Sequence, residues 1–418
     1  MKWHVAAPPH VDPTETSAVR RTDGRFVLSG PRQAWMDNLR VAVIAGVVIT
    51  HVATAYVLDV DWYYEERTAT VVSEVVLAAT IFPGALFALA ALFLVAGLLS
   101  ARSVARRGPR AFARGRLLRL GIPMLGYVLV LGPLAATIGD AAEGEMFSTS
   151  VWRSFDENVR TTDSGPMWFV AALLCFSCVY ALGRAVRPAR RDCADGPLRP
   201  RHLVLAAVAI VVASFSVRLA WPFAGDTPFT LNLWEWPQMA VMFSFGALAG
   251  EREWLNPPPS WLSPVTARGG ALGAVTLVAA GAVAAGSDNS EVFLGGLHLQ
   301  ALVEPVAEAT LAVSMSLWVA LWFMRHVTFD GRLARALARA SYPAYVIHPV
   351  VVVLLSAALA SIAVMAEVKF LVVATLGIAG AYGVGWIIVS VAAVLPYRLS
   401  AARGSPAAST EVNGEQPR

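Results

Sequence analysis

The chain alternates long apolar segments with short polar ones. A window of about 20 residues, the length of helix that crosses the hydrocarbon core of a bilayer, separates ten apolar segments. They cover 38–58, 71–99, 117–138, 167–186, 202–222, 236–250, 269–286, 298–323, 342–362 and 370–396. The pattern predicts an all-α polytopic membrane protein with about ten transmembrane helices, of which 236–250 is the shortest.

Composition supports this class. Of the 418 residues 56% are hydrophobic and only 15% are charged, and the mean hydropathy is +0.58. Soluble domains carry about 25% charged residues, so this chain has too little polar surface to cover a water-exposed globule. Its three cysteines also exclude a small scaffold held by disulfides.

The basic residues indicate how the helices are oriented. Of the 33 Lys and Arg residues, 27 fall in the two tails and in alternate loops, whereas acidic residues gather in the remaining loops. The positive-inside rule then places both termini in the cytoplasm. The pI of about 9.1 therefore describes orientation, and no nucleic-acid partner is expected.

Three parts of the chain follow from this pattern. We expect a flexible cytoplasmic tail over 1–33, a transmembrane domain over 34–397 and a second flexible tail over 398–418. The first 30 residues are polar, which excludes a cleaved signal peptide there. Only two of the basic residues are lysine, which is typical of a GC-rich genome and favours a bacterial plasma membrane.

Polar side chains inside apolar segments are the first candidates for a functional site, because each needs a partner at membrane depth. Arg40 and His51 lie eleven residues apart, which returns them to nearly the same face of a helix, about 16 Å apart along its axis. Arg40 is either a residue that extends to the cytoplasmic surface or part of a site. His51 is either a packed histidine or a group that exchanges a proton near neutral pH.

Two further candidates have structural alternatives. Arg116 and Arg119 share a face of an α-helix three residues apart, where they either clamp a phosphate or serve as a basic stop-transfer cluster. His348 precedes Pro349, which opens a helix locally. This histidine therefore either bonds to the freed backbone or acts as a ligand.

Glu304 and Glu308 lie four residues apart in the segment 298–323 and must be paired, protonated or next to water. They either orient a histidine or form the proton or ion site of a secondary transporter or exporter. The two halves of the chain carry no convincing repeat, which favours an enzyme.

The tryptophans and cysteines are weaker indications of a functional site. Trp62 and Trp168 belong either to the aromatic belt at the outer interface or to a surface on which a substrate stacks. Cys175 and Cys178 form a C-x-x-C inside an apolar helix without a second ligand pair, so no metal site is expected. Nucleotide-binding fingerprints are absent from the sequence.

The ordered combination of these residues resembles the acyltransferase-3 family of integral-membrane O-acyltransferases. The family's D-x-L-R and R-x10-H pattern matches Asp37-Asn-Leu-Arg40 followed by His51. Later matches are Leu92-Phe-Leu-Val-Ala-Gly97, Arg116-x-x-Arg119, Pro166-Met-Trp168-Phe, Met242-Phe-Ser-Phe-Gly246 and Ser341-Tyr-Pro-Ala-Tyr-Val-Ile-His348. The similarity covers about 34 to 395. The stretch from Pro237 to Trp254 is more similar to the branch that contains glucan succinyl-modifying enzymes.

The resemblance implies transfer of an acetyl, succinyl or similar group from cytoplasmic acyl-CoA to a hydroxyl of an envelope glycan, glycolipid or secreted metabolite. His51 and His348 are the histidines expected to take part in catalysis, and Arg40, Arg116 and Arg119 are the candidates for donor binding. An acidic residue should orient the imidazole, and the candidates are Glu304, Glu308 and Asp37. Asp37, Trp62 and Trp168 are the candidates for substrate binding. Acyl-CoA would be a substrate, with no permanently bound cofactor, and membrane lipids would surround the protein. His51 would act as a general base or carry the acyl group itself.

Overall fold

A computed structural model describes residues 34–57, 62–66, 70–161, 163–187 and 196–403, and no β-strand occurs in these ranges. Its α-helices are α1 (Ala34–Tyr56), α2 (Val71–Arg107), α3 (Pro109–Arg116), α4 (Ile122–Gly126), α5 (Gly132–Ala142), α6 (Phe147–Thr161), α7 (Trp168–Val186), α8 (Pro200–Arg218), α9 (Trp236–Glu251), α10 (Leu262–Ala285), α11 (Val303–His326), α12 (Arg332–Leu359) and α13 (Ala366–Arg403). Short 3-10 turns are η3 (Gly165–Met167), η4 (Pro228–Thr230), η5 (Leu233–Glu235), η6 (Ser290–Phe293) and η7 (Gln300–Leu302).

Nine helical stretches among the described residues are long and apolar enough to cross a membrane. They are Ala34–Tyr56, Phe87–Arg107, Pro109–Ala142, Gly165–Val186, Pro200–Arg218, Leu262–Ala284, Gln300–His326, Arg332–Leu359 and Ala366–Val394. The predicted segment 236–250, which is not among these nine, corresponds to α9, which has only 16 residues. The prediction of an all-α polytopic membrane protein is confirmed.

The short helix α9 is held by close packing against α2. A Cβ added to Gly97 of α2 would overlap the Phe243 carbonyl, and one added to Gly246 of α9 would overlap the Leu94 carbonyl. Only glycine allows the two backbones to approach this closely. The contact buries Met239 and Met242 completely, so α9 is a buried helix despite its length.

The third predicted segment is interrupted twice by π-helix. The π turns η1 (Leu117–Gly121) and η2 (Tyr127–Leu131) stand just before Pro123 and Pro133. A proline has no N–H and its ring collides with the carbonyl four residues earlier, and the wider turn relieves both problems. Side chains on either side of η1 are therefore rotated from their α-helical positions.

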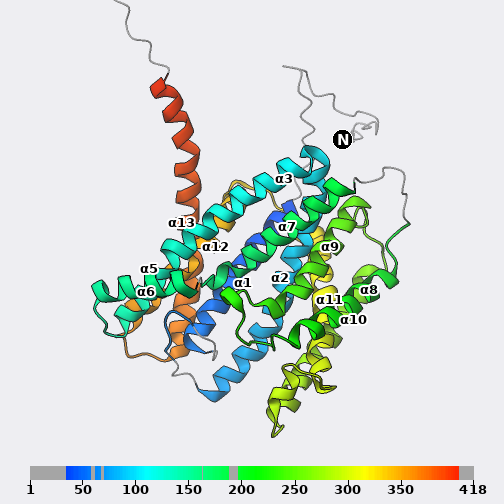
Figure 1. Cartoon of the computed structure of the whole chain (residues 1–418), viewed down its shortest axis with the longest axis horizontal. Helices are drawn as coiled ribbons and strands as arrows, with labels where there is room; N and C mark the ends of the chain where they lie inside the picture. Colours follow the sequence, from blue (N-terminus) through cyan, green and yellow to red (C-terminus); the bar gives the residue numbers. More distant parts are fainter. Residues whose placement is uncertain (1–33, 58–61, 67–69, 162, 188–195, 404–418) are drawn as a thin grey trace, which may run out of the picture. The chain divides into compact units, whose positions relative to one another are not determined.

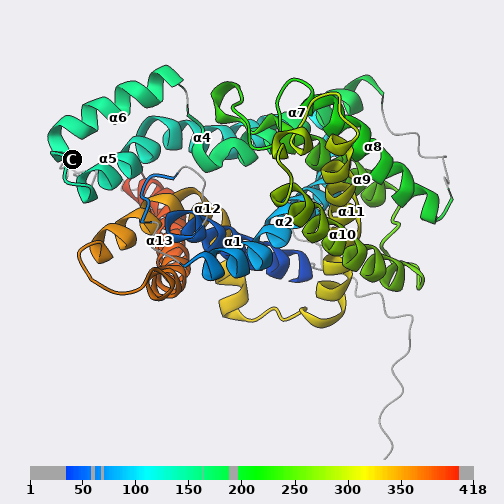
Figure 2. The same cartoon turned by 90° about the horizontal axis from the view of Figure 1, so that it is seen from below.

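Helix α1 is the central element of the part of the molecule that carries the site. It contacts α12 and α13 on one side and α2 and α11 on the other, and Figures 1 and 2 show it between them. Its first turn is tied to the segment after α11, because Asn38 Nδ2 donates to the carbonyls of Val327 (2.9 Å) and Phe329 (3.0 Å). Hydrogen bonds at its first turn and helix contacts along both sides therefore hold α1 in place.

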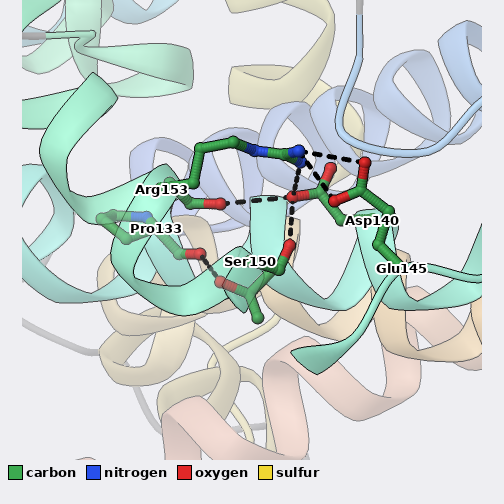
Figure 3. Close-up of polar contacts among 7 residues, drawn as sticks. Pro133, Asp140, Glu145, Ser150 and Arg153 are labelled. Carbon is green, nitrogen blue, oxygen red and sulfur yellow. Dashed lines mark hydrogen bonds and ion pairs between the residues drawn. The ribbon is translucent and has the colours of Figure 1, made fainter. Parts of the chain in front are cut away.

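Helices α5 and α6 form a hairpin held by polar groups (Figure 3). Asp140 accepts hydrogen bonds from Ser150 (2.5 Å) and Arg153 (2.8 Å), and Arg153 also pairs with Glu145. Ser150 and its helical neighbours four and eight positions on are buried, whereas Trp152 is 75% exposed. The protein-facing side of α6 is thus polar and another side is aromatic, as suits a helix at a membrane interface.

The two predicted tails lie outside the described residues, except that α13 continues beyond 397 to Arg403. The predicted location of both termini in the cytoplasm is likewise not described by the structure.

Candidate active site

His51 lies near the C-terminal end of α1, and its ring is held by the backbone of its own helix. Nδ1 is 2.9 Å from the Val47 carbonyl oxygen. Since a carbonyl can only accept, Nδ1 carries the hydrogen and Nε2 of a neutral His51 keeps a free lone pair. This is the tautomer that a general base requires.

His348 of α12 approaches the same nitrogen. Its Nε2 lies 3.3 Å from His51 Nδ1, with ring centroids 4.9 Å apart, and the residue is completely buried. Its own Nδ1 lies 2.5 Å from the Tyr345 carbonyl, so it donates there and leaves Nε2 as an acceptor for His51.

The sequence explains why His348 bonds to Tyr345. Pro349 has no N–H, so the Tyr345 carbonyl, four residues earlier, loses its helical donor. His348 supplies the missing hydrogen bond. His348 therefore does bond to the backbone carbonyl that Pro349 leaves free. The same hydrogen bond fixes the tautomer of His348 that faces His51.

Trp62 covers His51 from the loop after α1. The ring centroids are 4.6 Å apart, and the indole Nε1 is buried without a hydrogen-bond partner among the described residues. Its neighbour Tyr63 shares a hydrogen bond of 2.9 Å with Tyr127, and burial raises the pKa of the Tyr63 phenol well above its usual value. The aromatic wall beside His51 is thus uncharged near neutral pH.

A cavity of about 490 Å³ opens beside His51. Eight α1 residues line it, and they follow one broad face of the helix: Leu39, Ala42, Val43, Gly46, Val47, Ile49, Thr50 and His51. One face of α1 therefore forms a wall about 18 Å long, from the first turns of the helix to the catalytic candidate. This volume lies within the range of small-molecule sites.

The other end of the cavity is formed by residues of several loops and helices. Trp168 and Phe169 of α7 line it, together with Trp234 and Glu235 of η5. Trp168 thus lines the same cavity as His51, whereas Trp62 packs directly against the His51 ring.

Arg40 lies on the side of α1 that faces α12. Its Nη2 donates to the Ala338 carbonyl (2.7 Å) and pairs with Asp37 Oδ1 (3.1 Å). Arg40 and His51 therefore both contact α12, one at Ala338 and the other at His348. Asp37 lies beside Arg40, almost four helical turns from His51.

Arg116 and Arg119 differ in their exposure. Arg116 is half-buried, donates to Ser100 Oγ (3.3 Å) and stacks 5.3 Å from the Phe112 ring. Arg119 lies within η1 and is exposed. Seven arginines and no acidic residue lie between 100 and 119, so this end of α2 and α3 remains strongly basic.

Glu304 and Glu308 pair with an arginine near the end of the predicted segment 202–222. Arg218 lies at the end of α8, is 2% exposed and contacts Glu304 through Nη1 and Glu308 through Nη2 (2.8 Å). We call these three residues the charge cluster. Among the described residues the polar partners of His51 are Val47 and His348, not these carboxylates.

Arg218 was overlooked because it ends an apolar run where a loop arginine is also common. Its burial follows from the packing of α8 against α11, which sequence separation conceals.

Glu235 is a second residue that the sequence analysis missed. It is 8% exposed, lines the cavity and accepts a hydrogen bond from Gln238. Burial, and then the nearby Glu308, raise the pKa of Glu235 to about 8. The available signal was an acid between Trp234 and Trp236, just before an apolar segment that begins with proline.

The described residues contain no group of three or more His, Cys, Asp and Glu side chains arranged to hold a metal ion. The cavity instead offers the imidazole of His51, which His348 backs, one carboxyl group and a long apolar wall.

Comparison with known proteins identifies the family. The model of the Acyl_transf_3 family, described as an acyltransferase domain, matches residues 33–390, nearly the whole chain. Nothing significantly similar is found among curated proteins, nor among solved structures. The chain is a multi-pass membrane protein and belongs to the acyltransferase-3 family of acyltransferases.

Proposed function

We propose that this acyltransferase moves an acyl group from cytoplasmic acyl-CoA to a hydroxyl of an envelope glycan, glycolipid or secreted metabolite, in the plasma membrane of a bacterium. The single observation that carries the proposal is the position of His51. Its Nε2 is the free nitrogen of a fixed tautomer, and the residue lines the cavity along α1.

The reaction needs one proton acceptor at the cavity. His51 Nε2 takes the proton of the acceptor hydroxyl as its oxygen attacks the thioester carbonyl carbon. The new C–O bond forms, the C–S bond breaks, and the CoA thiolate receives the proton from His51. His348 accepts the Nδ1 hydrogen of His51 and so favours the imidazolium that forms between the two proton transfers.

The basic residues suit the donor. Phosphates of CoA would meet the arginines between 100 and 119, including Arg116 and Arg119, and the pantetheine arm would follow the α1 wall past Arg40. The acceptor would approach from the end where Trp168 and Trp234 lie. The indole N–H of Trp62 is a free donor for a substrate oxygen close to His51.

A transporter is not proposed. The carboxylates that motivated it have a guanidinium partner in Arg218, and the family is one of acyltransferases.

The central experiment follows labelled acyl-CoA into lipid and glycan fractions of membranes that contain the protein. His51→Ala should lower transfer about 10²–10⁴-fold, the usual contribution of general acid–base catalysis, with normal amounts of folded protein. Arg40→Ala should also abolish transfer. His326→Ala is the matched control, because His326 is an exposed histidine at the end of α11. Wild-type transfer by the His51→Ala protein would refute the assignment.

Donor binding is tested separately with purified protein and CoA. Replacing Arg116 and Arg119 by glutamine should weaken CoA binding, whereas Arg153→Gln, which changes an exposed arginine of α6, should not. Equal affinity in all three proteins would contradict the phosphate clamp. Mass spectrometry of glycans, glycolipids and secreted metabolites from a deletion strain would identify the acceptor by its lost acyl mass.

A further inference from the structure

The cavity beside His51 is apolar along almost its whole surface. Its larger side chains include Phe87, Trp168, Phe169 and Phe223. Among the described residues that line it there is no lysine or arginine, and the carboxyl group that reaches it is that of Glu235. Whatever acyl group is delivered to His51 must fit these surroundings.

Glu235 is fixed in place. Gln238 donates to its carboxylate, and Trp236 Nε1 donates to the Leu231 carbonyl (2.8 Å), which closes the backbone around it. Asn232, just before η5, adopts a left-handed conformation with φ of 47°. Such a conformation in a residue other than glycine costs of order 1 kcal/mol, so the surrounding contacts hold this segment in one shape.

The buried guanidinium of Arg218 is not available to pair with a carboxylate that an acyl group would bring into the cavity. Arg218 lies behind the cavity residue Phe223, 5.1 Å from its ring centroid. Its guanidinium is already paired with Glu304 and Glu308. Counting Glu235, this region holds three carboxyl groups and one guanidinium.

We propose that the enzyme takes donors with an uncharged acyl group, and that the apolar wall together with Glu235 excludes acyl groups that end in a carboxylate. The inference rests on the proposed acyl-CoA donor and narrows it. A carboxylate inside this cavity would lose its water without gaining a cation, and it would lie in the same cavity as a fixed acid. Acetyl or butyryl groups carry no such cost, whereas a succinyl group does.

Two unreactive thioethers test this without an acceptor. S-butyl-CoA and S-(3-carboxypropyl)-CoA have chains of equal length that end in a methyl group and in a carboxylate. Titration calorimetry on the purified full-length protein should show at least tenfold tighter binding of S-butyl-CoA. Equal binding, or tighter binding of the carboxylated compound, would overturn the proposal.

Charge reversal at one position sharpens the test. Glu235→Lys should reverse the preference, because it adds a cation to the cavity and leaves two cations facing two carboxylates. Measured at about pH 9, above the pKa of Glu235, Glu235→Gln should reduce the preference without reversing it, and it replaces the lysine variant if that variant does not fold. Glu251→Lys, at the other end of α9 and outside the cavity, is the matched control and should keep the wild-type preference.

If neither Glu235→Lys nor Glu235→Gln changes the ratio of the two thioether affinities, the proposed role of Glu235 is overturned. Failure of both thioethers to bind would instead contradict the acyl-CoA donor, and the inference would fall with it. Transfer of labelled butyryl from butyryl-CoA but not succinyl from succinyl-CoA in native membranes provides the corresponding activity measurement.

Discussion

The histidine pair, His51 and His348, and the charge cluster of Arg218, Glu304 and Glu308 solve the same physical problem differently. Both hold polar groups inside an apolar helix bundle. The histidines are held by backbone carbonyls and by each other, and His51 opens onto the cavity. The charge cluster pairs the guanidinium of Arg218 on α8 with two carboxylates of α11, and Glu308 is completely buried.

The difference teaches that a polar residue at membrane depth is not by itself evidence of chemistry. What distinguishes His51 from Glu308 is access to a cavity together with a nitrogen left free by its hydrogen bonds. A buried group whose polar atoms face only a fixed partner holds helices together, at the cost of removing charges from water.

The largest expected effect is on the charge cluster. Arg218→Met leaves the two carboxylates buried without their cation, and the free energy of unfolding should fall by about 3–5 kcal/mol. Thermal unfolding followed by tryptophan fluorescence measures this loss. Adding Glu304→Gln and Glu308→Gln should recover much of it. A stable Arg218→Met protein without transfer activity would show that the cluster takes part in the reaction.

The next effect concerns the cavity onto which His51 opens. A Cβ at Gly46 would meet no described atom within 4 Å, so Gly46→Leu fills free space instead of displacing the backbone. Its KM for acyl-CoA should rise about 10–200-fold, the usual effect of a few methylene groups in a pocket. Gly126→Leu, on an exposed face of α4, is the control. An unchanged KM would mean that the donor does not use this wall.

A smaller effect is expected within the pair. His348→Leu removes one of the two acceptors of the His51 Nδ1 hydrogen, while the Val47 carbonyl remains. A single hydrogen bond contributes about 0.5–1.5 kcal/mol, so kcat should fall about 2–10-fold, with a shifted pH profile. A loss as large as that of His51→Ala would instead place His348 at the reacting atoms.

The last prediction concerns the pH dependence of stability due to Glu235. Its pKa is about 8 in the folded protein and about 4.5 for an unperturbed glutamate. The folded state therefore binds more protons between these values, and stability present below pH 4.5 is lost as pH rises toward 8. The slope is at most about 1.4 kcal/mol per pH unit. Glu235→Gln should abolish this slope in urea unfolding, and parallel curves would contradict the assignment.

Much of the fold could be predicted because each membrane helix satisfies its own backbone and so leaves a local apolar signature. The segment 236–250 corresponds to α9 within one residue. The segment 117–138 was predicted as one uniform helix, but two prolines introduce π turns and place Arg116 and Arg119 in different surroundings. How a proline changes the helical register depends on the local packing, so a hydropathy profile does not predict it.

The site was predictable only in part. Eleven-residue spacing places Arg40 and His51 on one side of α1, and both do contact α12. The partners of each residue come from almost 300 positions away, such as Ala338 and His348, and no local pattern identifies them. Glu235 was missed for the same reason, since its importance lies in the cavity that it lines.

By itself the sequence determined the membrane class, the helices, the acyltransferase family and the two residues Arg40 and His51 on one helix. These follow from local hydropathy, helical period and ordered motifs. Only the tertiary structure decided that His348 fixes His51, that Glu304 and Glu308 belong to Arg218, and that Glu235 shares the cavity. The reason is that an ion pair, a tautomer or a cavity depends on which distant helices meet, and short-range periodicity carries no information about that.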